Sequence, residues 1–287
     1  MRNFFLLCLI FPFQLYAETS VWRVSKGDSE LYLGGTIHML SASDYPLPVE
    51  FQQAYERSHK LVLETDLVAM EQLAAQQELL RRLMYQPGKT LKDDLNQQTY
   101  QALANYSASI GLNMQTLVLF RPPMVMITLL LIELNRLGMN GIGVDKYFNQ
   151  KALADGKSLG ALESVQVQLT VIENMGKGHE DEMILNTLEE MRELPMIMTD
   201  MKDAWRKGDM QRLEEIGVTA MKSEFPDLFR LLLVDRNNAW LPKIEALLMT
   251  PEVELILVGA LHLTTHEGLI MKLREQGYTV EYFNPQS

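Results

Sequence analysis

Two segments at opposite ends of the chain share the pattern Gly-x-x-His. His38 ends residues 31–38, Leu-Tyr-Leu-Gly-Gly-Thr-Ile-His, and His262 ends residues 255–262, Leu-Ile-Leu-Val-Gly-Ala-Leu-His. In both, an apolar run typical of a buried strand leads to a glycine, which allows a close backbone approach or a positive φ. Ligands in open α/β sheets bind beyond the carboxyl ends of strands. The two imidazoles would share one site if their strands are neighbours; otherwise each is a hydrogen-bonded structural residue.

Carboxylates follow two other apolar runs. Glu64 comes directly after residues 61–63, and Glu163 comes directly after residues 159–162. Acids at the mouth of a sheet are costly to bury unless they are paired, solvated or bound to metal. Two histidines with one or two carboxylates could hold a divalent metal ion, which would lower the pKa of its bound water. The alternative is that Glu64 and Glu163 cap helices that begin just after the strands.

Strands and helices must alternate along the chain to position these residues. The patterns predict a hairpin of strands at 21–24 and 30–33, and further strands at 60–63, 157–162, 253–258 and 279–283. They predict helices at 48–57, 66–84, 96–110, 122–137 and 265–276, and a long helical stretch over 165–248 with breaks near Gly176, Gly208 and Pro226. The expected fold class is α/β, with a mixed central sheet covered by helices and a long helical middle section.

The first residues are typical of an export signal. Arg2 precedes a nearly unbroken apolar run at 4–15, and Ala17 offers a small residue for cleavage just before polar residues. We therefore expect a signal peptide at 1–17, with an uncleaved anchor as the alternative. A single domain should occupy 18–287, and the protein should be exported, to the periplasm of a bacterium. The removed segment would contain Cys8, so the mature chain would have no disulfide and no thiol nucleophile.

The charge and hydropathy of the mature chain limit its partners. Removing residues 1–17 takes away one arginine and no acid, so the formal charge changes from −11 to −12. This acidity argues against nucleic acid, because phosphate binding needs clustered basic residues. The apolar stretch at 122–137 is too short and too charged at its ends to span a bilayer, so no integral membrane span is expected after signal removal. A peptide or small-molecule substrate remains, and the oligomeric state stays open.

The sequence resembles the TraB/PrgY/GumN family, whose animal relatives are the Tiki proteins, proposed metal-dependent proteases. The resemblance extends over nearly the whole mature chain. It is carried in order by residues 34–38, Leu63-Glu64-Thr65-Asp66, Arg121-Pro122-Pro123, Gly143-Val144-Asp145, Leu162-Glu163 with Gln168, Trp205 with Gly208-Asp209, Arg236-Asn237 with Trp240, and 258–263 with Gly268. It implies an α/β fold related to the erythromycin-esterase and ChaN-like proteins. One departure is local: residues 263–267 stand where relatives often have glycines, which leaves His266 either a helper of the site or an exposed residue at a helix start.

The resemblance and the residue types together predict a metal-dependent hydrolase that acts on peptide bonds. His38 and His262 would hold the metal ion, which could be manganese, cobalt or zinc. Glu64 would be the third ligand or the general base. The alternative is a non-catalytic protein that uses the same histidines to bind haem or a small ligand, as in ChaN-like proteins. No Gly-x-Ser-x-Gly motif and no phosphate-binding glycine-rich loop occurs in the sequence.

Three further polar residues have expected roles in that hydrolase. Arg236 and Asn237 would stabilise a developing oxyanion, and Asp145 would orient a histidine from behind. All three match recurrent polar positions of the family that the sequence resembles.

Overall fold

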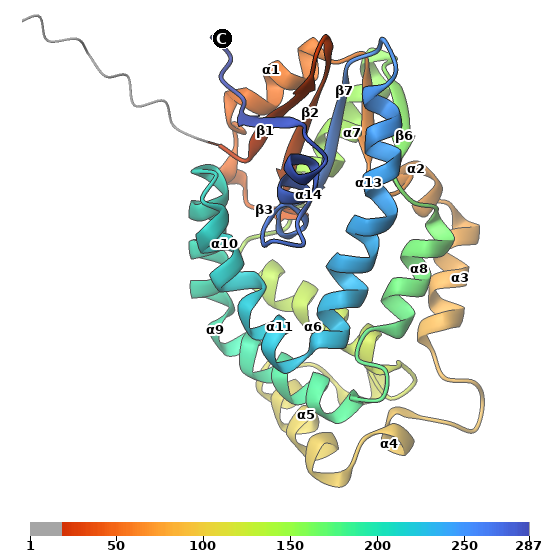
Figure 1. Cartoon of the computed structure of the whole chain (residues 1–287). Coiled ribbons are helices and arrows are strands. Elements are labelled where there is room, and N and C mark those ends of the chain that lie inside the picture. Colours follow the sequence, from red (N-terminus) through yellow and green to blue (C-terminus); the bar gives the residue numbers. More distant parts are fainter. Residues whose placement is uncertain (1–18, 287) are drawn as a thin grey trace, which may run out of the picture.

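A six-stranded mixed sheet forms one half of the molecule (Figure 1). The computed structural model describes residues 19–286, so the predicted signal peptide lies outside the described residues. In spatial order the strands are β6 (Ser158–Ala161), β4 (Lys60–Leu63), β7 (Glu254–Gly259), β2 (Ser29–Thr36), β1 (Val21–Lys26) and β8 (Thr279–Tyr282). The first four are parallel, whereas β1 is antiparallel to both β2 and β8. The predicted α/β class with a mixed central sheet is confirmed.

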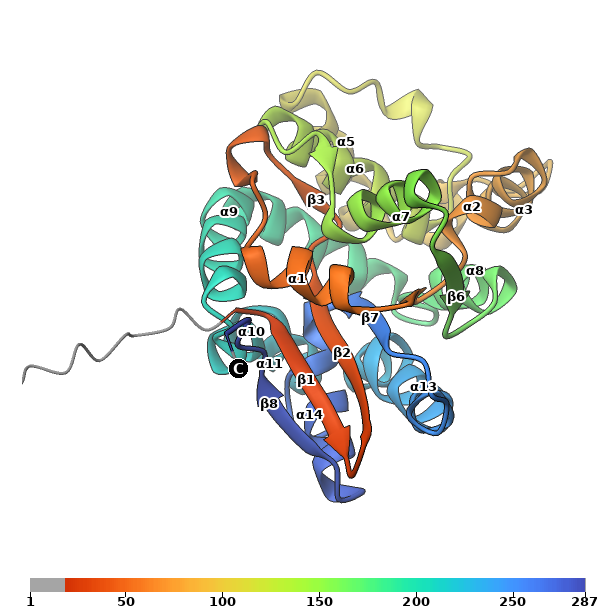
Figure 2. The same cartoon turned by 90° about the horizontal axis from the view of Figure 1, so that it is seen from above.

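Helices cover both faces of this sheet (Figure 2). Along β7, Leu255 and Leu257 point into one apolar core, and Ile256 and Val258 point into the other. The first core is closed by α1 (Val49–Arg57) and α7 (Val144–Asp155), the second by α13 (Asp235–Leu248) and α14 (Leu269–Glu275). Because both faces of β7 are buried, its sequence is continuously apolar and not alternating.

A helical section lies beyond the edge where the parallel strands end (Figure 1). Its helices are α2 (Leu67–Met70), α3 (Leu73–Leu83), α4 (Leu91–Asp94), α5 (Gln97–Ser109), α6 (Pro122–Arg136), α8 (Val165–Asn174), α9 (Glu180–Arg206), α10 (Met210–Gly217), α11 (Thr219–Glu224) and α12 (Pro226–Phe229). Short turns are η1 (Ala42–Asp44), η2 (Met114–Thr116), η3 (Arg230–Val234) and η4 (Ala260–Leu263), and β3 (Met39–Leu40) pairs with β5 (Gly141–Ile142). Across residues 19–286, no helix combines the length and the apolar character needed to cross a membrane.

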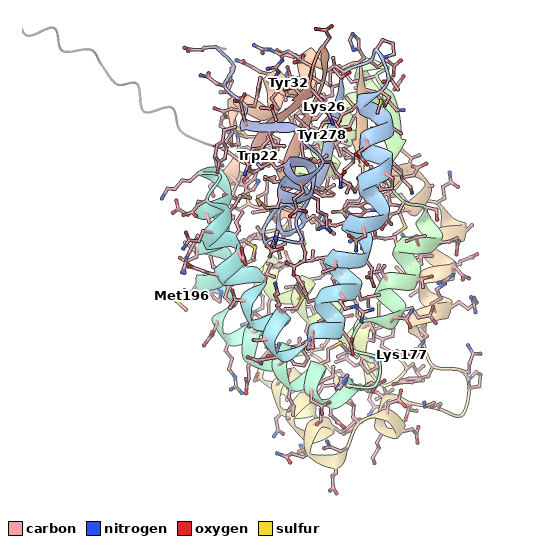
Figure 3. All side chains as sticks on the ribbon, in the orientation of Figure 1. Trp22, Lys26, Tyr32, Lys177, Met196 and Tyr278 are labelled. Carbon is pink, nitrogen blue, oxygen red and sulfur yellow. The ribbon has the colours of Figure 1, made fainter. Side chains whose placement is uncertain are left out.

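The outer edge of the sheet is closed by the end of the chain. Strand β8 pairs with β1, and Lys26 at the end of β1 lies 4.7 Å from the centre of the Tyr278 ring just before β8 (Figure 3). Trp22 on β1 and Tyr32 on β2 belong to the two opposite cores. The final β-α-β unit is therefore present, but its two strands are separated in the sheet by β2 and β1.

Two predicted helices differ from the observed ones. The stretch 66–84 is divided into α2 and α3 by a turn at Glu71 and Gln72. The last helix was predicted from residue 265 but begins at Leu269, because Thr265 has a φ of 66°, which helical residues do not adopt. His266 is therefore in a loop, with its side chain mostly exposed.

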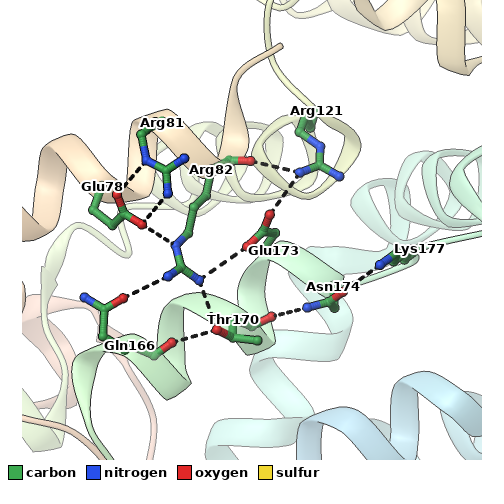
Figure 4. Close-up of polar contacts among 9 residues, drawn as sticks. All are labelled: Glu78, Arg81, Arg82, Arg121, Gln166, Thr170, Glu173, Asn174 and Lys177. Atoms are coloured by element: carbon green, nitrogen blue, oxygen red, sulfur yellow. Dashed lines mark hydrogen bonds and ion pairs between the residues drawn. The ribbon is translucent and has the colours of Figure 1, made fainter. Parts of the chain in front are cut away.

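An arginine network ties α8 to α3 (Figure 4). Arg82 on α3 donates to Gln166 Oε1 at 2.8 Å and to Glu173 Oε2 at 3.3 Å, both on α8. Arg121 donates to the Arg82 carbonyl at 3.0 Å and to Glu173 Oε1 at 3.3 Å. Arg121, one of the residues that carry the family resemblance, therefore has a structural role. Its contacts with Arg82 and Glu173 help to fix α8, the helix that carries Gln168.

Candidate functional site

The two histidine turns leave neighbouring strands at the same edge of the sheet. Strands β2 and β7 are parallel and paired, with Thr36 opposite Gly259. On the other side of β7 lies β4, with Leu63 opposite Leu257, and Glu64 follows it directly. Beyond β4 lies β6, and Glu163 follows it two residues later. The condition for a shared site, that the two histidine-bearing strands are neighbours, is met.

Three of the predicted site residues converge on Gly259. A Cβ atom at this glycine would lie 3.3 Å from Glu64 Oε1, 3.7 Å from His262 Cδ2 and 3.8 Å from His38 Nε2. The Gly259 N–H also donates to Glu64 Oε1 at 2.6 Å. Its φ of −51° is open to any residue, and a Cβ would be tight only against Glu64 Oε1, so the effect of glycine here is to keep this space open. The strand end therefore leaves a small polar space between two imidazoles and a carboxylate.

Arg236, at the start of α13, forms the centre of a buried charge network. Its Nη2 donates to Glu64 Oε2 at 2.6 Å, to Glu163 Oε1 at 2.7 Å and to Gln168 Oε1 at 2.8 Å, and its Nε donates to Glu163 Oε2 at 3.1 Å. Its Nη1 lies 3.2 Å from His262 Nε2. Each guanidinium nitrogen is already engaged, whereas the oxyanion role expected for Arg236 needs a free N–H. In this arrangement Arg236 holds two carboxylates together, so the oxyanion role stays a prediction that would require one of these contacts to be exchanged.

These contacts determine the ionisation of Glu64. Burial raises its pKa, but attraction to His262 in its protonated form, to Arg236 and to His38, with the hydrogen bond from Gly259, outweighs burial and lowers the pKa to about 2. Glu64 is therefore ionised at neutral pH. Such a carboxylate is a weak general base, since a base works best with a pKa near the working pH.

Asn237 orients His262. Its Oδ1 lies 2.7 Å from His262 Nδ1, and its Nδ2 donates to the carbonyls of His262 at 3.2 Å and Glu267 at 3.0 Å. Because an amide oxygen only accepts, His262 Nδ1 carries the proton and Nε2 keeps its lone pair. Both amide hydrogens of Asn237 are used, so the oxyanion role expected for it would likewise require one of these bonds to be exchanged. Burial lowers the pKa of His262 to about 3, so this imidazole is neutral at physiological pH.

The Arg236–Asn237 pair follows a π-helical turn. The turn, η3, runs without a break into α13, and Trp240 one helical turn later donates to Glu163 Oε2 at 3.0 Å. The His262 ring also packs on Trp240, with centroids 4.4 Å apart. π-Helical turns occur frequently at functional sites.

His38 has a carboxylate partner of its own. Asp145 Oδ2 lies 3.3 Å from His38 Nδ1, the contact expected for a residue that orients a histidine. Gly143 allows α7, which carries Asp145, to begin in direct contact with the backbone of His38. A Cβ at Gly143 would be 2.3 Å from the His38 carbonyl carbon. The negative charge of Asp145 raises the pKa of His38 above 6.5. The His38 side chain is 63% exposed, so its Nε2 faces an accessible space.

That space is a cavity of about 270 Å³. Its lining residues are Thr36, His38, Leu63, Glu64, Thr65, Leu67, Met70, Asp145, Gln168 and Leu257. Three buried oxygens of this lining have no hydrogen-bond partner in the described part of the chain, namely Thr36 Oγ1, Thr65 Oγ1 and Asp145 Oδ1. Buried polar atoms are nearly always paired, so three in one cavity indicate a place for a polar ligand.

The donor chemistry around Gly259 fits a divalent cation. In residues 19–286 no group of three or more His, Cys, Asp or Glu side chains already has the arrangement of a metal site. The Nε2 atom of His262 and Oε1 of Glu64 are 3.8 Å apart. Ligands lie about 2.0–2.2 Å from a zinc ion, so two ligands of one ion can be separated by up to roughly 4 Å. Each histidine has its Nδ1 fixed by an oxygen and Nε2 directed inward, the usual arrangement of ligating histidines.

The charge balance points the same way. Glu64, Glu163 and Asp145 together with Arg236 give a net charge of −2 when both imidazoles are neutral, and of −1 when His38 is protonated. A cation there would replace the proton of His38, and it would be opposed by the Arg236 guanidinium, 3.2 Å from His262 Nε2.

A family model described as TraB/PrgY/gumN matches residues 20–282, nearly the whole chain. The chain belongs to the TraB/PrgY/gumN family. No curated protein and no solved structure matches it. The TraB/PrgY/gumN resemblance seen in the sequence is thereby confirmed, and the match spans the sheet and the helical section together.

Several contributors to this TraB/PrgY/gumN site were missed in the sequence. Thr36 is the last residue of β2 and Thr65 follows Glu64 directly, but no local pattern gives either hydroxyl a role of its own. Gln168 lies five residues after Glu163, in the first turn of α8, and so reaches Arg236. Glu163 was considered equally as a helix cap, but Ser164 is the cap of α8 and Glu163 is bound to Arg236.

Proposed function

We propose that the protein is a metal-dependent hydrolase that acts on peptide bonds, with His38, Glu64 and His262 as the metal ligands. The observation that carries this proposal is the convergence of these three side chains on the space left by Gly259. Two histidines and a glutamate, with the fourth position open, are a donor set of catalytic zinc sites. A bound divalent ion would supply a water molecule of lowered pKa and would polarise a substrate carbonyl.

The residues around the three proposed ligands would orient the ligands and bind the substrate. Asp145 and Asn237 hold the Nδ1 atoms, which leaves Nε2 of each ring for a metal ion that displaces the proton of His38 and the Arg236 contact of His262. Arg236 keeps Glu64 ionised and therefore able to serve as a ligand, and the low pKa of Glu64 favours this role over general base. A substrate carbonyl or amide could pair with the unpartnered Thr36 and Thr65 hydroxyls. A peptide bond offers both a donor and an acceptor to such a lining.

Calorimetric titration of metal into the purified, chelator-treated protein tests the proposal. Manganese, cobalt and zinc are each added to the wild type and to His38→Ala and His262→Ala, with His266→Ala as the matched control because this histidine is exposed outside the site. We expect at least one metal to bind the wild type and the control equally and both site variants at least tenfold more weakly. Hydrolysis of a quenched-fluorescent peptide library should then require that metal. Equal binding in all four proteins, or no binding in any, would refute the metal centre.

The alternative, a haem or small-ligand binding protein, uses the same histidines. A cavity of about 270 Å³ lies just below the usual range of ligand sites, roughly 300–1,000 Å³, and so favours a small ligand over haem. An absorbance titration with haemin decides: a Soret shift that His38→Ala abolishes would support haem binding over hydrolysis.

A further inference from the structure

A second and larger cavity, of about 480 Å³, lies in the helical section. It is bounded by one face of α9, by α10 to α12 with η3, and by the loop between α8 and α9. Its volume is within the range of sites for drug-sized ligands. None of the residues assigned above to the hydrolytic site lines it.

The interior of this cavity is apolar and adaptable. Met126, Met183 and Met221 line it together with Phe225 and Leu232. Methionine side chains are flexible and polarisable, and they are frequent on surfaces that accept varied apolar partners.

Acidic residues stand around this apolar interior. Glu182 and Glu190 come from α9, and Glu224 and Asp227 come from the opposite wall. Within residues 19–286, no ion pair joins a lysine or arginine to the three glutamates, and Asp227 is 3.8 Å from Arg230. Glu190 accepts one hydrogen bond, from Asn186. Partial desolvation raises the pKa of Glu190, although its side chain reaches solvent, and the charge of Glu224 raises it further, so a cation placed between them would offset this repulsion.

The basic residues nearby do not supply that cation. Lys177 lines the cavity but donates to Asn174 Oδ1 at 3.4 Å (Figures 3 and 4). Lys222 on α11 is paired with Glu267 at 3.0 Å. His179, also in the lining, is exposed at the start of α9.

The larger cavity lies next to the proposed hydrolytic site, on the side of Arg236 and His262. Leu232, in its wall, accepts a hydrogen bond at its carbonyl from Arg236 Nη1 at 3.4 Å. Gly217, also in its wall, packs so closely on Leu261 that a Cβ would lie 2.7 Å from Leu261 Cδ2. Leu261 precedes His262, so the wall of the cavity supports the second Gly-x-x-His turn.

We propose that this second cavity binds a basic, apolar peptide segment, with leucine-like side chains among the methionines and a lysine or arginine between Glu190 and Glu224. The proposal rests on the proposed function only in naming a peptide as the ligand. Charge complementarity commits it to a basic occupant, since Glu190 and Glu224 are exposed at the rim of the cavity without a lysine or arginine partner in residues 19–286, and an acidic segment would be repelled by them.

Fluorescence anisotropy with three labelled peptides tests this proposal. In each peptide leucine alternates with one other residue, which is lysine in the first, glutamine in the second and glutamate in the third. The full chain is used, with chelator present. Glu190→Gln/Glu224→Gln removes the two cavity charges. Glu189→Gln/Glu215→Gln removes two exposed charges outside the lining and so keeps the same net charge as a matched control.

We expect the lysine peptide to bind at least tenfold more tightly than the glutamine peptide, and the cavity variant to lose about tenfold while the control does not. Equal binding by the two double variants, equal binding of the three peptides, or no binding of the lysine peptide would overturn the proposal. The same titration with His38→Ala separates the two hypotheses: binding should persist there even if no hydrolysis is ever found. A failed titration, conversely, leaves the metal experiment unaffected.

Discussion

Replacement of Arg236 by methionine should destabilise the protein strongly and in a pH-dependent way. Methionine keeps much of the volume of the arginine stem but leaves Glu64 and Glu163 buried without their shared cation. Breaking a buried ion pair on one side costs about 3–5 kcal/mol, because an uncompensated charge remains.

The pKa of Glu64 gives the scale of what its partners contribute together. A pKa lowered from 4.5 to about 2 corresponds to about 3 kcal/mol of stability, at about 1.4 kcal/mol per pKa unit, shared among Arg236, the two histidines and the Gly259 N–H. In the wild type this contribution is present above the unfolded pKa and is lost as the pH falls toward 2. In Arg236→Met the folded pKa of Glu64 should rise above the unfolded value. Glu64 of the folded variant would then take up a proton at a higher pH than Glu64 of the unfolded chain. The loss of stability relative to the wild type should therefore shrink as the pH is lowered from 7 to 5.

Urea unfolding followed by circular dichroism at pH 7 and pH 5, with chelator present, measures both effects. Arg230→Met is the matched control: Arg230 belongs to η3, its side chain is 64% exposed, and its carboxylate partners are 3.8 and 4.0 Å away. We expect a loss of about 3–5 kcal/mol for Arg236→Met at pH 7 and less than about 0.5 kcal/mol for the control. A loss below about 1 kcal/mol, or a deficit equal at both pH values, would refute the charge network as described.

Three further predictions concern the space around Gly259. Asp145→Asn should lower the pKa of His38 toward 6.5 in NMR titration of the chelator-treated protein, because the carboxylate charge raises it; an unchanged pKa would contradict the contact. Gly259→Ala should leave the free energy of unfolding within about 1 kcal/mol, since its φ suits alanine, but should abolish metal binding in calorimetry by filling the space; retained binding would place the metal elsewhere. Asn237→Leu should weaken metal binding by about 10–100-fold through loss of the His262 contact, and calorimetry showing wild-type affinity would exclude that positioning role.

Much of this site followed from local sequence, because parallel strands present their carboxyl ends at one edge. The apolar runs that lead to His38, Glu64, Glu163 and His262 can each be recognised from local sequence. The one further assumption is that their strands are neighbours in the sheet. The roles of Arg236 could not be recognised in this way. It contacts acids that are 172 and 73 residues away, and no local pattern reports such a pairing.

Local geometry explains the other errors. The amphipathic pattern after residue 264 favours a helix, but Thr265 adopts a positive φ and its hydroxyl accepts the N–H of Glu267. Hydroxyl side chains compete with helical backbone bonds in this way, and a periodicity argument does not detect it. An oxyanion role for Asn237 needs a free amide hydrogen, and the sequence does not show that the folded chain supplies two carbonyls for this amide.

The π-helical turn at Arg230–Val234 accommodates one residue more than an α-helical turn would in the same rise. Deleting a single residue from it would therefore convert it to an ordinary α-helical turn and leave the helices on both sides in nearly the same orientation. The extra residue belongs to a segment that contacts both sites, because Leu232 lines the larger cavity while its carbonyl accepts from Arg236. A change in this turn would therefore reach both cavities, although they share no lining residue.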